Sequence, residues 1–209
     1  HADSLGAAGR YGQGDVQWMT AGAGIQHTEM FPLLHKDRKN PLELFQIWLN
    51  LPAADKFVDP YYTMLWKEDI PVIKHEDKEG RKSEITLIAG NYKGTDAPAP
   101  PPDSWAAKKA NDISIMIIKM EPDANWSIPV LPPEIERSIY FYRGSGLIVN
   151  GENIPSYQAV HMSPGSPLDI QNGEEESYLL ILQGKPIHEN VVQYGPFVMN
   201  SRTEIQQAF

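Results

Sequence analysis

The sequence predicts an all-β protein of two tandem β-barrels that ends in a short α-helix. Short apolar stretches follow one another at regular spacing and are separated by turn residues, which is typical of a barrel or a sandwich. A content of 18 Pro and 16 Gly suits a chain that is broken into many strands and turns. The pair Asn150-Gly151, directly after an apolar run, is a strong hairpin signal.

Residues 1–93 contain the strands that we expect in the first barrel. Asp15–Trp18 reads as a short strand after a glycine turn. Apolar residues alternate over Leu44–Leu51, which predicts a strand whose odd-numbered side chains are buried. Ile70–His75 and Ser83–Ile88 read as a strand pair around a charged turn.

A proline-rich segment, residues 94–112, is expected to be an exposed loop or linker between two units. The second unit, residues 113–209, has further strand candidates at Ile113–Met120, Ser138–Tyr142, Gly146–Val149, Ala159–Met162, Leu168–Gln171 and Tyr178–Gln183. Ser201-x-x-Glu204 has the spacing of a capping box, so we expect a short helix at the C-terminal end.

Composition excludes several classes of function. A formal net charge of −9 does not attract nucleic-acid phosphates, so we expect no direct binding to nucleic acid. The absence of cysteine excludes disulfides, thiolate metal sites and cysteine nucleophiles, and it fits a cytoplasmic protein. No apolar run approaches the ~20 residues of a membrane span, so no membrane partner is expected. We expect a monomer.

The candidate site is His27-x-Glu29, which follows the glycine-rich Gly22-x-Gly24. Positions two apart in an extended strand face the same side, so the imidazole and the carboxylate would project into one space. Such a nitrogen and oxygen pair suits iron or another first-row divalent metal. The alternative interpretation is a polar pair on a strand that faces solvent.

The stretch Gln17–Glu29, read as Q-W-M-T-A-G-A-G-I-Q-H-T-E, resembles the pirin family, a branch of the cupins. The resemblance continues in Leu44–Pro52 and returns in Gly184–Ile187 and Tyr194–Asn200, so it brackets nearly the whole chain. It implies a bicupin with a metal site in the first barrel. It implies no metal in the second barrel, because Ile128–Tyr142 holds no histidine where a cupin would place its ligands.

The chain departs from the family pattern in one respect. Pirin-like proteins supply two further histidines from an earlier strand, in a P-H-x-H-x-G-F type of motif, and no such motif precedes Tyr11. We therefore expect that the family's N-terminal part is missing, and His1 is not at a family ligand position. A barrel without its edge strands has unpaired backbone groups, so we predict that residues 1–209 alone are not a stable folded unit.

The resemblance implies a function for the site. His27 and Glu29 would bind one Fe²⁺ per chain, or another divalent first-row metal, and Glu29 would be the catalytic base of a quercetin 2,3-dioxygenase. The substrate would be a small aromatic molecule of the flavonol class. The family also contains non-enzymatic regulators that bind a transcription factor or a metabolic enzyme, so a protein partner is the alternative. A third reading is a metal-free structural bicupin.

Overall fold

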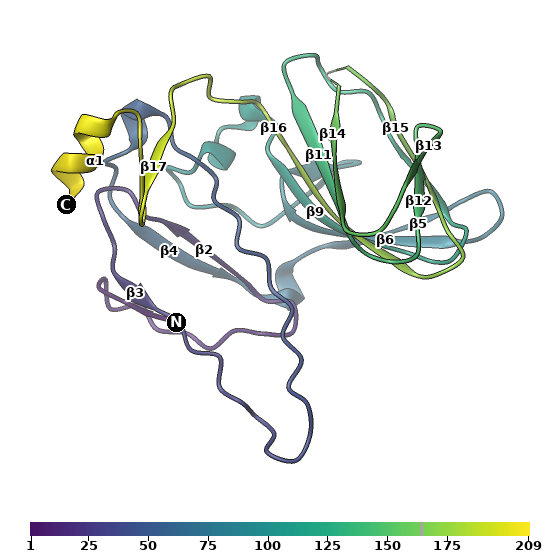
Figure 1. The fold of residues 1–209 in the computed structure, drawn as a ribbon, viewed down its shortest axis with the longest axis horizontal. Coiled ribbons are helices and arrows are strands. Elements are labelled where there is room, and N and C mark those ends of the chain that lie inside the picture. Colours follow the sequence, from purple (N-terminus) through teal and green to yellow (C-terminus); the bar gives the residue numbers. More distant parts are fainter. Residues whose placement is uncertain (164) are drawn as a thin grey trace.

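The structure is a computed structural model that describes residues 1–163 and 165–209, and its regular elements are mostly β-strands (Figure 1). In chain order the strands are β1 (Ala2–Asp3), β2 (Val16–Thr20), β3 (His27–Thr28), β4 (Tyr61–Leu65), β5 (Val72–Glu76), β6 (Lys82–Ala89), β7 (Asn91–Tyr92), β8 (Thr95–Asp96), β9 (Ser114–Met120), β10 (Asn125–Ile128), β11 (Glu136–Arg143), β12 (Leu147–Val149), β13 (Glu152–Ile154), β14 (Gln158–Met162), β15 (Leu168–Asn172), β16 (Ser177–Gly184), β17 (Val192–Tyr194) and β18 (Phe197–Met199). The helices are the 3₁₀ turns η1 (Ala53–Asp55), η2 (Lys67–Asp69), η3 (Trp105–Ala107) and η4 (Lys109–Asn111), and the α-helix α1 (Arg202–Ala208). The expected all-β class with a C-terminal helix is confirmed. No helix of the described residues is both long enough and apolar enough to cross a lipid bilayer.

Two sheets face each other on the right of Figure 1 and form a closed sandwich. One has the strand order β14-β11-β16-β9-β6-β5, and the other has the order β10-β15-β12-β13. Apolar side chains from both sheets fill the space between them, with Trp126, Phe141 and Ile139 among the largest that are fully buried. The Asn150-Gly151 hairpin is confirmed, because both residues have positive φ and join β12 to β13.

A second apolar layer lies on the outer face of the six-stranded sheet. Leu180 and Ile115 point to this face and pack with Leu65, Val16 and Trp18 from the β2–β4 pair. The central strand β9 is therefore covered on both sides, which explains why it is apolar at nearly every position. Strand β11 instead alternates between buried and more exposed residues, as a strand with one covered face does.

The hydrogen bonding of the large sheet crosses the division that we expected from sequence, with units at 1–93 and 113–209 and a linker at 94–112. Strand β6 pairs with β9, and β5 pairs with β6, so both join the sheet of the second unit. The buried residues of β6 explain this arrangement, because Ile85 and Leu87 belong to the core between the two sheets. The division into two units stays a prediction.

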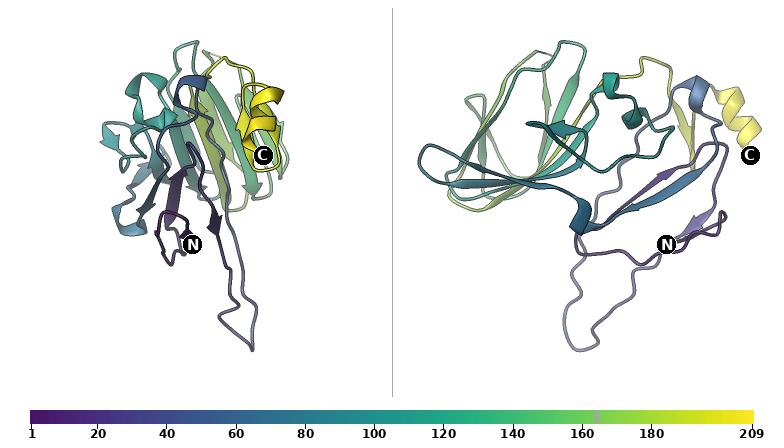
Figure 2. Two further views of the ribbon diagram at one scale, coloured as in Figure 1. Left: turned by 90° about the vertical axis from the view of Figure 1, so that its left-hand side faces the viewer. Right: turned by 180° about the vertical axis from the view of Figure 1, so that it is seen from behind.

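The segment between β3 and η1 differs from the sequence prediction. Residues 44–51 were expected to be a strand with a buried odd-numbered face, and this is wrong: they form no strand, and Phe45 and Ile47 are 38% and 37% exposed. Both views in Figure 2 show that the stretch between β3 and these residues extends away from the rest of the chain as a long loop. Alternating apolar residues predict burial only where another layer of the protein covers the strand. Little of the protein covers residues 44–51.

We expected the proline-rich segment to be an exposed loop or linker, but parts of it are buried. Pro101 is fully buried, and the indole nitrogen of Trp105 donates a hydrogen bond of 2.8 Å to the carbonyl of Lys185. Lys108 forms an ion pair of 2.9 Å with Asp55 in η1. The segment therefore packs against two distant parts of the chain.

Helix α1 begins with the capping box that the sequence predicts. The Ser201 hydroxyl accepts a hydrogen bond from the amide of Glu204 at 3.2 Å, and the Glu204 carboxylate accepts from the amide of Asn200 at 2.9 Å. Ile205 is buried, and Phe209 packs edge-on against Phe197 of the β17–β18 hairpin. The helix is thereby held against this hairpin.

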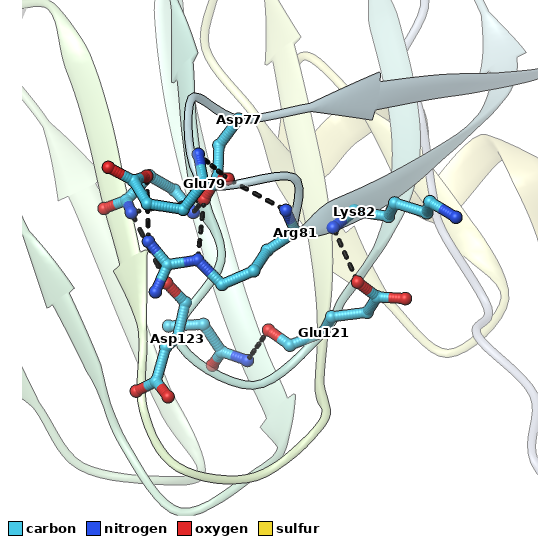
Figure 3. A network of polar contacts seen from close by, with 8 residues as sticks. Asp77, Glu79, Arg81, Lys82, Glu121 and Asp123 are labelled. Atoms are coloured by element: carbon cyan, nitrogen blue, oxygen red, sulfur yellow. Dashed lines mark hydrogen bonds and ion pairs between the residues drawn. The ribbon is translucent and has the colours of Figure 1, made fainter.

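A carboxylate at the tip of the β5–β6 hairpin ties this hairpin to the sandwich (Figure 3). Asp77 accepts hydrogen bonds from the amides of Glu79 and Arg81 at 3.0 and 2.9 Å, and from the amide of Asn125 at 3.0 Å. The guanidinium of Arg81 donates a further bond at 3.1 Å. Although desolvation opposes the charged form, the hydrogen bonds from Asn125 and Arg81 hold the pKa of Asp77 well below its usual range.

We expect Asp77→Asn to lower the melting temperature of the sandwich at pH 7. A depressed pKa means that the folded state favours the carboxylate, so this contribution is present above the unfolded pKa of about 4 and is lost as the pH falls below it. The difference in melting temperature between wild type and variant should therefore shrink below about pH 4. Asp123→Asn is the matched control, because no described residue donates a hydrogen bond to the Asp123 side chain. Equal effects of the two substitutions at pH 7 would contradict the assignment.

Candidate functional site

The turn after β2 positions the candidate site. Gly22 and Gly24 both have positive φ, at 51° and 131°, and they reverse the chain between β2 and β3. The amide of Ala23 donates a hydrogen bond of 2.9 Å to the carbonyl of Val58, which fixes this turn against the segment before β4. A Cβ on Gly22 would collide with the same carbonyl. Only glycine therefore fits at this position.

We expect Gly22→Ala to loosen the turn and cost about 1–3 kcal/mol, because it adds backbone strain and forces the Val58 carbonyl away. Hydrogen exchange of the β2 and β4 amides should report this as a local loss of protection. Gly12→Ala is the matched control, since its Cβ would meet open space and its φ is not positive. The prediction fails if both variants exchange like the wild type.

The carboxylate of Glu29 is held by two donors from other parts of the chain. The Tyr11 hydroxyl donates a hydrogen bond of 2.9 Å to Glu29 Oε1, and the Gln17 side-chain amide donates to the same oxygen. Burial, and then the hydrogen bond to Glu29, raise the pKa of Tyr11 to about 12. Tyr11 therefore remains a donor at every physiological pH. No described residue donates a hydrogen bond to Glu29 Oε2.

Strand alternation explains how Gln17 reaches Glu29. Val16 and Trp18 on β2 pack toward the sandwich, so the intervening Gln17 points to the opposite face, where Glu29 lies. The sequence left open whether Trp18 lines the site or belongs to the core, and its packing favours the core.

His27 lies on β3, opposite Asp3 of β1, and its side chain is exposed. Its ring is stacked at 5.7 Å on the ring of His1, which in turn stacks on Tyr62 at 4.2 Å. Nε2 of His1 is 2.9 Å from the buried carboxylate of Asp3. The rings of His27, His1 and Tyr62 thus form a row, and the carboxylate of Asp3 lies beside His1.

The residues present supply only part of a metal site. His27 and Glu29 are donors of the type that divalent iron accepts, but two donors bind such a metal weakly. Across residues 1–163 and 165–209, no three His, Cys, Asp or Glu side chains gather as a metal-binding group. Nδ1 of His1 is buried with no hydrogen-bond partner in this part of the chain, yet its ring does not complete such a group. The described residues therefore do not hold a metal by themselves.

The described interior of the sandwich is apolar. Apolar side chains fill it, and the buried Trp126 indole donates its hydrogen bond to Tyr92 at 3.1 Å. His161 on β14 points outward and is 2.8 Å from the hydroxyl of Ser138.

Sequence reasoning did not find Tyr11, Gln17, Tyr62 or Asp3. Gln17 stands inside the stretch that carries the family resemblance, and a polar residue between two apolar ones on a short strand could have marked it. The fold alone brings Tyr11 and Tyr62 to the site. Tyr11 lies 18 residues from its partner Glu29 in sequence, and Tyr62 lies 45 residues from its partner Gln17.

Comparison with known proteins places the chain in a family. Residues 1–49 match the family described as "Pirin", and residues 115–209 match the "Pirin C-terminal cupin domain". A Pseudomonas aeruginosa protein named "Putative quercetin 2,3-dioxygenase" is 34% identical over 208 residues, which is all of this chain and 68% of the relative. Human "Pirin" is 30% identical over 214 residues, again all of this chain and 67% of the relative.

A solved structure agrees with the sequence matches. The crystal structure of a quercetin 2,3-dioxygenase from Acinetobacter baumannii aligns with a TM-score of 0.76 and 25% identity, over 99% of this chain and 68% of that one. With the intact stretch Gln17–Glu29 and the cupin sandwich, these matches lead to one conclusion: the chain belongs to the pirin family.

Proposed function

We propose that this chain is part of a pirin-type dioxygenase that cleaves a flavonol with molecular oxygen. In this proposal His27 and Glu29 are two ligands of a divalent metal, for which Fe²⁺ fits the donor types best. The remaining ligands come from outside the described residues, because these residues gather no third donor.

The arrangement around Glu29 carries the proposal. Tyr11 and Gln17 fix one carboxylate oxygen, and no described residue donates to the other. A carboxylate held in this way can accept the hydroxyl proton of a flavonol, which leaves the electron-rich anion that reacts with oxygen at its central ring. The names of the Pseudomonas aeruginosa and Acinetobacter baumannii proteins support the choice of substrate class.

The wild-type chain is tested alone and together with a separately expressed segment that carries the P-H-x-H-x-G-F type of motif of the pirin family. The purified protein is loaded anaerobically with ferrous iron, and its bound metal is measured by elemental mass spectrometry before quercetin and oxygen are added. The proposal expects close to one iron per chain and quercetin-dependent oxygen uptake when the segment is present, and little bound iron without it. Bound iron without oxygen uptake, in an assay where a known dioxygenase consumes oxygen, would rule out the activity. No bound iron even with the segment present would rule out His27 and Glu29 as ligands of such a site.

A further inference from the structure

Strand β11 carries a buried cation at one end of the sandwich. Arg137 is only 4% exposed. Its side chain points between the two sheets, because Ile139 and Phe141, two and four residues further along the strand, belong to the apolar core there. Strand β11 lies between β14 and β16 (Figure 1), and Arg137 is paired with Met162 on the first and with Gln183 on the second.

The guanidinium of Arg137 has a polar neighbour but no anionic one. Its Nε and Nη2 donate hydrogen bonds of 3.2 and 3.0 Å to the same side-chain oxygen of Gln183. The side-chain amide of Gln183 donates in turn to the carbonyl of Asp112 at 3.4 Å, which keeps the Gln183 oxygen toward Arg137. No carboxylate of the described residues forms an ion pair with this guanidinium, and none of these residues accepts a hydrogen bond from its Nη1.

A buried charge without a counter-charge is unusual, because removing an ion from water costs free energy that a paired anion normally offsets. Among the described arginines only Arg137 is buried, whereas the more exposed Arg81 and Arg143 each have a carboxylate, at 3.1 and 2.7 Å. Burial lowers the pKa of Arg137, and the charge of Asp112 opposes this shift without cancelling it. Arginine nevertheless stays protonated at physiological pH. An anion that reached this guanidinium would therefore bind favourably.

A cavity of about 290 Å³ gives access to this end of the strand pair. It is bordered by Arg137 and Met162, and by Glu136, Ser138 and His161. Strand β14 is the edge of its sheet, so inward-facing and outward-facing residues can border the same cavity. The Ser138 hydroxyl and Nδ1 of His161 lie 2.8 Å apart and add polar groups to it. Glu136 is exposed and, as the residue next to Arg137, faces the opposite side of the strand.

The geometry points to a binding site for a small organic carboxylate at this edge of the sandwich, with Arg137 as the group that binds the carboxylate. A guanidinium and a carboxylate are both planar and match each other in a two-point contact, and Nη1 is the nitrogen that Gln183 does not engage. The volume of the cavity limits the ligand to a small molecule. This inference depends neither on a metal nor on the proposed dioxygenase chemistry, because all five bordering residues lie in the C-terminal region.

Nitrogen-15 NMR of the arginine side chains tests the inference on the full chain. Acetate and benzoate are the probes, and acetamide and benzamide are their uncharged counterparts of nearly the same shape. We expect at least one of the two carboxylates to shift the Nε–H resonance of Arg137 to saturation, and its amide to bind at least ~10-fold more weakly. The inference is overturned if neither carboxylate gives a saturating shift, or if carboxylate and amide bind equally. Tighter binding of inorganic phosphate would also overturn it, because the ligand class would then be different.

Two substitutions at the guanidinium provide the matched comparison, with binding measured by calorimetry. Gln183→Glu keeps the shape of the side chain but places a carboxylate on Arg137, so the site is satisfied from within the chain. Arg137→Met removes the charge and keeps a long side chain that suits a buried position. We expect each to weaken binding of the carboxylate at least ~10-fold.

Arg202→Met changes an exposed arginine of α1 and should bind like the wild type. Circular dichroism confirms that each variant is folded, and Gln183→Glu remains a complete test even if Arg137→Met does not fold. Wild-type affinity in Gln183→Glu would show that the carboxylate does not bind to the guanidinium, which would overturn the inference. An equal loss of affinity in Arg202→Met would also overturn it, because the binding would then reflect only the overall charge of the chain.

Discussion

Replacing Glu29 by glutamine is expected to lower the proposed oxygen uptake with quercetin by at least about 100-fold, the usual contribution of a positioned base. Glutamine has almost the same shape but cannot take the substrate proton. Its amide would also be a poorer partner for Tyr11 and Gln17, which both donate to Oε1 of the native carboxylate. The rate of oxygen consumption and the bound iron are measured on the same samples, so that loss of the base is distinguished from loss of the metal.

Two further variants distinguish the loss of the Glu29 base from a change in the position of its carboxylate. Tyr11→Phe removes one donor but leaves the base, so we expect a smaller loss of about tenfold, with a pH profile like that of the wild type. Glu134→Gln changes an exposed carboxylate elsewhere in the chain and should leave the rate unchanged. If Glu29→Gln consumed oxygen as fast as Glu134→Gln, Glu29 would not be the base.

Much of the sandwich could be predicted because local signals determine it. Strand β9 is apolar on both faces, the Asn150-Gly151 turn fits positive φ, and the Ser201 capping box begins a helix without distant partners. Such features depend on residues close together in sequence. The pairing of β6 with β9 was not predicted, because strand pairing depends on partners that a periodic pattern does not name.

The candidate site could likewise be predicted only in part from the sequence. The spacing His27-x-Glu29 can be read from the sequence because it is local, whereas the need for glycine at Gly22 arises from the carbonyl of Val58, which is distant in sequence. The support of Glu29 by Tyr11 arises from the fold and could not be read from spacing. Residues 44–51 failed as a predicted strand for a related reason: alternation indicates that a segment can pair, but it does not supply the neighbouring strand.

Replacing Trp126 by alanine is expected to destabilise the sandwich by about 3–5 kcal/mol, a large share of the ~5–15 kcal/mol that holds a typical domain together. Trp126 is 1% exposed and lies in the core between the two sheets. Its loss leaves a cavity and also leaves the buried Tyr92 hydroxyl without its donor. Urea unfolding followed by circular dichroism measures the change without relying on tryptophan fluorescence.

The comparison with two other variants shows which part of this effect comes from packing. Tyr92→Phe removes only the hydrogen bond and should cost about 1–2 kcal/mol. Trp66→Ala removes an indole that is 44% exposed and should cost less than Trp126→Ala, because a large part of this indole is already in water. If Trp126→Ala were as mild as Trp66→Ala, the measured transition would not be the unfolding of the sandwich. The predicted order places Trp126→Ala above both Tyr92→Phe and Trp66→Ala, because only the first variant empties space between the sheets.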